Sequence, residues 1–178
     1  YKPVFNPGLK TPFPLIIGRG EVDLYYLRSK LNGYLEKLSR LDPTGLTRGF
    51  IEHLGSLGLS LARLAKYADV LCMLLTLCLE NGLSVGEVLR PDRKAAERVV
   101  ALVNRSGYSA WTKHDLLLAY RKLVQYARYG SCAPGTPLPP EVAWIRLREP
   151  RENGPKPEEL LTPEEVVRIA SAAENPRD

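Results

Sequence analysis

The sequence has few of the residues from which catalytic and metal sites are usually built. It contains two histidines, His53 and His114, and three cysteines, Cys72, Cys78 and Cys132. Neither histidine stands at a spacing that suggests a zinc site or a Ser/His or Cys/His pair. We therefore expect no metal, no cofactor and no catalytic residue in this chain. The odd number of cysteines indicates free thiols and a reducing, intracellular setting.

Long apolar runs, nucleotide-binding loops and strand patterns are also missing. No apolar run approaches the roughly 20 residues that span a membrane. Residues 18–20 lack the third glycine of a dinucleotide fingerprint, and no phosphate-binding loop motif occurs. Apolar and polar residues almost never alternate with period two, the pattern of a half-buried strand. The sequence thus predicts an all-α protein with no membrane partner and no small-molecule substrate.

Positive charge is concentrated in the middle of the chain. Residues 60–130 carry 11 Lys and Arg against 6 Asp and Glu, whereas residues 131–178 carry 6 against 9. A basic surface attracts polyanions. This distribution therefore permits nucleic-acid binding by the middle of the chain.

Residues 60–81 form the most regular helical pattern in the sequence. Ser60 stands where an N-cap hydroxyl is wanted, and Gly82 where a left-handed C-cap is wanted. Arg63 and Lys66 lie off the apolar stripe, near the end at which the helix dipole is positive. They predict an anion site at the start of this helix, or else an ordinary solvated face. The stripe consists of Leu61, Leu64, Ala68, Leu71, Leu75 and Cys78.

Two segments come before this helix. Residues 1–20 hold four prolines and no helical period, and we interpret them as an extended arm. Residues 21–44 contain a leucine-rich helix that Asp42-Pro43 ends. Its seam suits either an oligomerisation element that pairs with a second subunit or packing within its own domain. The seam consists of Leu24, Leu27, Leu31, Tyr34, Leu38 and Leu41.

Capping signals divide residues 45–130 into further helices. Thr112 and Asp115 have the form of a capping box, and we expect the neighbouring Trp111 to lie in the core. The other predicted elements are a short helix over 47–57, a capping box at Ser84 and Glu87, an N-cap at Asp92, and a helix that ends at Gly130.

The last part of the chain reads as a linker followed by a helix. Residues 131–157 contain seven prolines around one apolar group, Val142–Ile145, and predict a semi-rigid extended linker. In the segment 158–178, Thr162-Pro163 opens a short helix with threonine as N-cap and proline at the first helical position. A helix this short is marginal alone. We therefore expect it to belong to a domain that continues beyond the sequence.

Three stretches taken together carry a family resemblance. They are Phe50–Leu54 with Gly58–Ser60 and Tyr67, Tyr108–Lys113 with Leu116–Tyr126, and Glu159–Val166 with Asn175–Asp178. In this order and spacing they resemble the tyrosine recombinases, most closely the integrases of archaea and their viruses and the related Xer-type enzymes. The resemblance implies a SAM-like core-binding bundle of four or five helices at 45–130, preceded by an extra helix. It also implies that 158–178 is the first helix of a truncated catalytic domain.

The resemblance implies a function as well. Members of this family close two domains around duplex DNA, work as tetramers in the cytoplasm at the nucleoid, and exchange strands with a tyrosine nucleophile and no metal or nucleotide. No tyrosine of this chain matches that nucleophile, so the chain is expected to bind DNA without catalysing strand exchange. The starts of two helices would supply the DNA contacts. The residues nominated are Ser60, Arg63, Lys66, Ser109, Thr112, Lys113 and Arg121.

Two other classes of function stay open at this point. An all-α transcription regulator would need a compact helix, a short turn and a recognition helix, and the long pattern over 60–81 leaves no room for them. A helical protein–protein interaction domain would leave the basic excess of residues 60–130 unexplained. Binding of duplex DNA is therefore the leading hypothesis.

Overall fold

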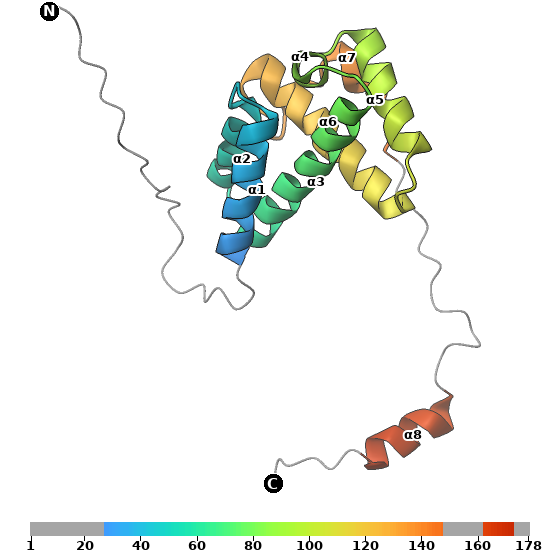
Figure 1. Ribbon diagram of the computed structural model, residues 1–178. Coiled ribbons are helices and arrows are strands. Elements are labelled where there is room, and N and C mark those ends of the chain that lie inside the picture. Colours follow the sequence, from blue (N-terminus) through green and yellow to red (C-terminus); the bar gives the residue numbers. More distant parts are fainter. Residues whose placement is uncertain (1–26, 148–161, 173–178) are drawn as a thin grey trace, which may run out of the picture. The chain divides into compact units, whose positions relative to one another are not determined.

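The computed structural model describes residues 27–147 and 162–172, and all regular structure within these ranges is helical (Figure 1). The all-α prediction is therefore confirmed for this part of the chain. The predicted arm 1–20 lies outside the described residues, as do 21–26, 148–161 and 173–178. The helices are α1 (Leu27–Leu41), α2 (Leu46–Ser56), α3 (Leu61–Glu80), α4 (Val85–Leu89), α5 (Arg93–Arg105), α6 (Ala110–Tyr129), α7 (Pro140–Ala143) and α8 (Pro163–Ala172). None of these helices is long and apolar enough to cross a bilayer.

The chain divides into two compact units, Tyr1–Arg148 and Glu149–Asp178. The second unit contains α8, whose start has the predicted cap. The Glu165 N–H donates to the Thr162 hydroxyl at 3.2 Å, and the Thr162 N–H donates back to the Glu165 carboxylate at 2.8 Å. The exposed large apolar side chains of α8 are Val166, Val167 and Ile169.

Helix α3 is the centre of the first unit, and α1, α2, α4, α5 and α6 all contact it. Both of its predicted caps are confirmed: the Ser60 hydroxyl accepts from the Arg63 N–H, and Gly82 takes a left-handed φ of +76° after the helix. Because neighbours surround α3, its buried face is wider than the predicted stripe. The buried residues are Leu64, Ala65, Ala68, Val70, Leu71, Cys72, Leu74, Leu75 and Cys78.

Helix α1 packs against α3 of the same chain. Leu31 and Leu38 of the predicted seam are 1% and 0% exposed, and Leu35, which the seam omits, is buried beside them. Packing within its own domain therefore accounts for Leu31, Tyr34, Leu38 and Leu41 of the seam. The seam residue Leu24 lies outside the described residues.

The bend between α1 and α2 is held by the side chain of Asp42, which is 1% exposed. Its carboxylate accepts from the backbone N–H of Thr44 at 2.9 Å and from that of Thr47 at 2.8 Å, and both threonine hydroxyls donate to it as well. Burial alone would raise the pKa of Asp42, but these hydrogen bonds outweigh it and lower the pKa. Gly45 then starts α2 with a left-handed φ of +74°.

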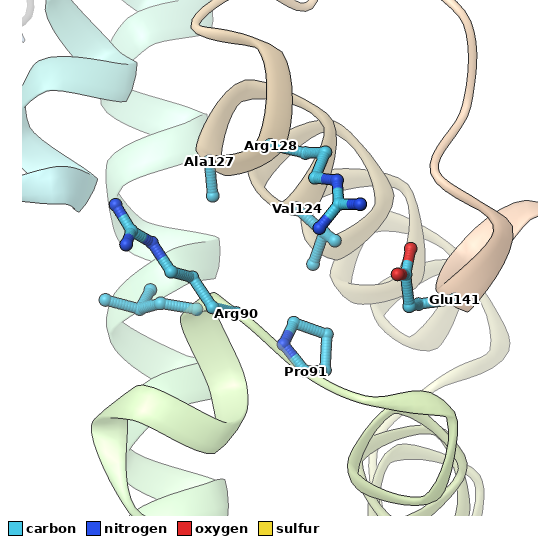
Figure 2. Close-up of a pocket in the computed structure, with 7 residues that line it drawn as sticks. Arg90, Pro91, Val124, Ala127, Arg128 and Glu141 are labelled. Atoms are coloured by element: carbon cyan, nitrogen blue, oxygen red, sulfur yellow. The ribbon is translucent and has the colours of Figure 1, made fainter.

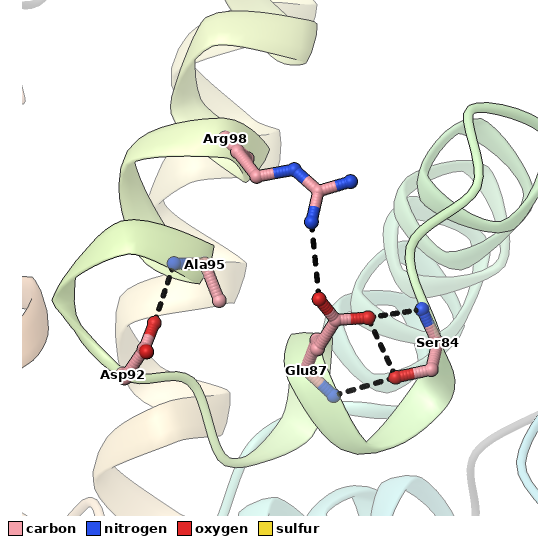
Figure 3. A network of polar contacts seen from close by, with 5 residues as sticks. All are labelled: Ser84, Glu87, Asp92, Ala95 and Arg98. Atoms are coloured by element: carbon pink, nitrogen blue, oxygen red, sulfur yellow. Dashed lines mark hydrogen bonds and ion pairs between the residues drawn. The ribbon is translucent and has the colours of Figure 1, made fainter.

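A polar network joins α4 to α5 (Figure 3). Ser84 and Glu87 form the predicted capping box, and Asp92 caps α5 by accepting from the Ala95 N–H at 2.7 Å. Arg98 of α5 reaches back to the Glu87 carboxylate at 3.0 Å. The Glu87 carboxylate thus caps the start of α4 and also forms an ion pair with Arg98 of α5.

The predicted linker begins too early, because residues 131–147 pack onto the bundle. Val142 and Ile145 are 0% and 3% exposed within the same core as the long helices. The Cys132 N–H donates to Nε2 of His53 at 3.1 Å, which fixes the beginning of this segment. The first unit therefore extends beyond the predicted 45–130 at both ends, through α1 and through α7. The remainder of the predicted linker, 148–157, lies outside the described residues.

The start of α6 differs from the prediction in two ways. Ser109 is the N-cap, with its hydroxyl accepting from the Thr112 N–H at 3.2 Å, so the box of Thr112 and Asp115 does not form. Trp111 is 44% exposed instead of buried, and its ring meets the His114 ring edge-on. The physical reason is position: Trp111 lies in the first turn of α6, before the buried face of the helix begins at Leu116.

Candidate nucleic-acid interface

Residues 63–70 of α3 lie beside residues 115–122 of α6 on the first unit. Each helix begins at an exposed serine cap, Ser60 and Ser109. An ion pair links their second turns, with Lys66 Nζ 2.7 Å from Asp115 Oδ2. Neither helix has an acidic residue in its first turn, so nothing there offsets the positive end of the helix dipole. Figure 1 shows α3 and α6 crossing within the bundle.

A groove of about 320 Å³ opens between α3 and α6. Arg63 and Lys66 line it from α3, and Lys122 lines it from α6. The Lys122 ammonium lies 5.7 Å from the centroid of the Tyr67 ring, a cation–π arrangement that orients it. Three cations against one carboxylate leave the groove with a positive charge. Its other lining residues are Leu59, Val70, Asp115, Leu118 and Ala119.

Sequence reasoning missed Lys122 and chose its neighbour Arg121. Lys122 follows Asp115 by seven residues, which is two helical turns on one face, and that spacing is the signal that points to it. Arg121 does not line the groove. Its Nε is buried and has no hydrogen-bond partner in the described part of the chain, and burial lowers the pKa of its guanidinium.

The other nominated side chains at the helix starts are held by contacts within the protein. The Ser60 and Ser109 hydroxyls cap their helices, and the Thr112 hydroxyl lies 2.9 Å from that of Ser109. Lys113 donates from Nζ to the backbone carbonyl of Asn104 at 2.9 Å, in the last turn of α5. These contacts fix the positions of the two helix starts. Of the seven nominated residues, Arg63 and Lys66 are the pair that shares the groove.

Acid–base or metal chemistry has no obvious centre in the part of the chain that the structure describes. No group of three or more His, Cys, Asp or Glu side chains there is placed to hold a metal ion. Nε2 of His53 is already an acceptor for the Cys132 N–H. Burial raises the pKa of Cys72 to about 11 and that of Cys78 to about 12, which disfavours the reactive thiolate. What the α3–α6 surface offers is the positive charge of Arg63, Lys66 and Lys122.

Comparisons with known proteins leave the family open: no family model, no curated protein and no solved structure matches this chain. Function is therefore inferred from the residues of the α3–α6 surface.

Proposed function

We propose that this chain is the DNA-binding region of a tyrosine recombinase of the integrase type and that it holds duplex DNA at a recombination site. The observation that carries the proposal is the groove between α3 and α6, which Arg63, Lys66 and Lys122 line together. Duplex DNA presents about one negative charge per 1.7 Å of its axis, and clustered Lys and Arg side chains neutralise it. The groove offers such a cluster on a rigid pair of crossed helices.

The ion pairs of the first unit also favour the α3–α6 groove as the DNA interface, because they show which cations are available to a phosphate. Arg63 forms no ion pair with a described residue, whereas Arg40 and Arg93 each pair with a glutamate on their own helix. Lys66 does pair with Asp115, but the lysine side chain is 62% exposed. The Asp115 side chain is 23% exposed, so the pair is open to solvent on the lysine side. An ammonium has three N–H donors, so a phosphate can bind Lys66 from that side without displacing Asp115.

The finer parts of the proposal come from the sequence resemblance. They are the SAM-like character of the bundle, the closing of two domains around the duplex, and assembly into a tetramer on DNA. Ser60, Ser109, Thr112 and Lys113 would then position the helix starts against phosphates, since such contacts fix register more than they read sequence. No residue of this chain is assigned a role in strand exchange.

Fluorescence anisotropy tests the proposal with a labelled duplex of about 30 base pairs at several salt concentrations. We expect steep salt dependence and a preference for duplex over single-stranded DNA. Arg63→Ala, Lys66→Ala and Lys122→Ala should each weaken binding and reduce the slope of log K against log salt by about 0.9, the value for one phosphate contact. Arg40→Ala is the matched control, because it also removes one exposed cation but does not line the groove.

Two outcomes would contradict the proposal. The native chain could fail to bind duplex DNA even at low salt, which removes the DNA-binding function. Alternatively, the three groove variants could keep the native salt slope, or lose no more than Arg40→Ala does. In that case DNA binds elsewhere and the α3–α6 groove is not the interface.

The apolar lining of the groove favours a second candidate, an acidic amphipathic helix of a partner protein. Leu59, Val70 and Leu118 offer contacts that a phosphate backbone cannot use. A helix with an apolar face and flanking carboxylates would use both these residues and the cations around them. Leu118→Ser separates the candidates: it weakens binding of such a helix strongly and leaves the salt slope for DNA unchanged.

A further inference from the structure

A large aromatic side chain is exposed at the start of α6. Trp111 lies in the first turn of the helix and is 44% exposed. Its ring meets the ring of His114 edge-on, with 5.9 Å between the centroids and 78° between the planes. This contact limits the orientations of the indole. Single exposed apolar residues are common on protein surfaces, so the surroundings of Trp111 decide what it can do.

Trp111 continues the row of α6 residues that line the α3–α6 groove. Asp115, Leu118 and Lys122 of the groove follow it by four, seven and eleven residues, which is the spacing of one helical face. One helical turn, about 6 Å along the axis, separates Trp111 from Asp115. The aromatic ring therefore lies on the face of α6 that carries the groove, one turn closer to the start of the helix.

The phosphate backbone of DNA offers an indole ring no apolar partner, so the bases are the part of the duplex that suits Trp111. The major groove is about 12 Å wide and admits an α-helix. Its apolar group is the C5-methyl of thymine, which lies beside the O4 acceptor of the same base. The minor groove presents hydrogen-bonding groups instead. An indole has the groups that match the thymine edge, an apolar ring and one N–H donor.

We propose that Trp111 packs against thymine methyl groups in the major groove, so that binding favours sequences that contain A·T pairs. This inference rests on the proposed DNA-binding function and adds a base contact to it. Arg63, Lys66 and Lys122 hold phosphates, and the first turn of α6 enters the groove. Because the contact between indole and methyl involves no charge, it adds affinity without changing the salt dependence of binding.

Uracil in place of thymine tests this contact, because the two bases differ only in the C5-methyl group. Anisotropy titrations use duplexes made only of A·T pairs, once with thymine and once with uracil. The native chain should bind the thymine duplex about fourfold more tightly, as expected for burial of one methyl-sized apolar group. Trp111→Ala should bind the two duplexes equally. It should also keep the native salt slope, unlike the three variants of the groove cations.

The other end of α6 supplies the matched control. Tyr129 is an aromatic residue with the same exposed fraction, 44%, but it lies in the last turn, about 27 Å from Trp111 along the helix axis. Its neighbour Arg128 lines a separate cavity with Arg90 and Glu141, and that cavity shares no lining residue with the α3–α6 groove (Figure 2). Tyr129→Ala should therefore keep the native preference for thymine.

Three results would overturn the inference. Equal binding of the two duplexes by the native chain would show that no methyl group is contacted. A Trp111→Ala chain that keeps the native preference would show that the methyl groups act elsewhere or through the shape of the duplex. In both cases the DNA-binding function stands if the cation variants behave as expected. If the native chain binds neither duplex at low salt, the proposed function fails, and this inference fails with it.

Discussion

At the scale of single residues, Asp42 has the clearest consequence for stability. The hydrogen bonds from Thr44 and Thr47 lower its pKa in the folded chain. A lowered pKa means that the carboxylate stabilises the fold fully above the ordinary value of about 3.9, and that this contribution is lost as pH falls through the lower folded value. Asp42→Asn should therefore reduce the free energy of unfolding by about 1–3 kcal/mol at pH 7.

Urea unfolding at pH 7 and at pH 3 checks this prediction. At pH 3, below the ordinary carboxyl pKa of about 3.9, Asp42 is mostly protonated in the unfolded chain, so the gap between Asp42→Asn and the native chain should narrow. Glu36→Gln is the control, because Glu36 is exposed and, among the described residues, pairs with Arg40 on its own helix. An Asp42→Asn chain as stable as the native one at pH 7 would show that the bend does not depend on the carboxylate.

At the scale of elements, the sequence predicts contacts between residues close together in the chain well, and contacts between distant residues poorly. The caps at Ser60, Ser84 and Asp92 are confirmed because each is satisfied within three residues of the chain. The docking of residues 131–147 depends on the bond from Cys132 to His53, which lies 79 residues away. Proline content predicts extended backbone there. It does not predict which distant surface will cover an apolar side chain.

The candidate site shows the same division. The sequence nominates Arg63 and Lys66 together because they share one helix start, and that relation is local. Lys122 joins them only through the crossing of α3 and α6, which places residues of two separate segments around one groove. The predicted burial of Trp111 is wrong for a related reason: a large apolar residue predicts burial, but burial depends on which turn of α6 the neighbouring helices cover.

A pair of valine substitutions tests whether residues 131–147 are part of the bundle. Val142→Ala should lower the free energy of unfolding by about 1–3 kcal/mol, because Val142 is 0% exposed and its loss leaves a cavity. Val167→Ala, in α8, should change stability by less than about 0.5 kcal/mol, since Val167 is 64% exposed. Denaturant unfolding followed by circular dichroism measures both. Equal, small effects would mean that the segment is not docked in solution.

At the scale of the whole molecule, the three thiols report how the first unit opens. Cys72 and Cys78 are buried in α3, and Cys132 is buried in the docked segment 131–147. Burial raises the pKa of all three, so few thiolates are present at neutral pH and labelling of the native chain should be slow. Segments with fewer buried contacts open at lower free energy than the core does.

Labelling with a thiol reagent in increasing urea, with mass spectrometry to identify each cysteine, should therefore modify Cys132 first. Cys72 and Cys78 should follow together, at the urea concentration where circular dichroism shows the helices unfolding. The Cys72 thiol donates to the backbone carbonyl of Tyr34 at 3.6 Å, so α1 covers it directly. Labelling of Cys72 as early as Cys132 would mean that α1 separates from α3 before the bundle unfolds. The leucine seam of α1 would then be free to pair with a second subunit.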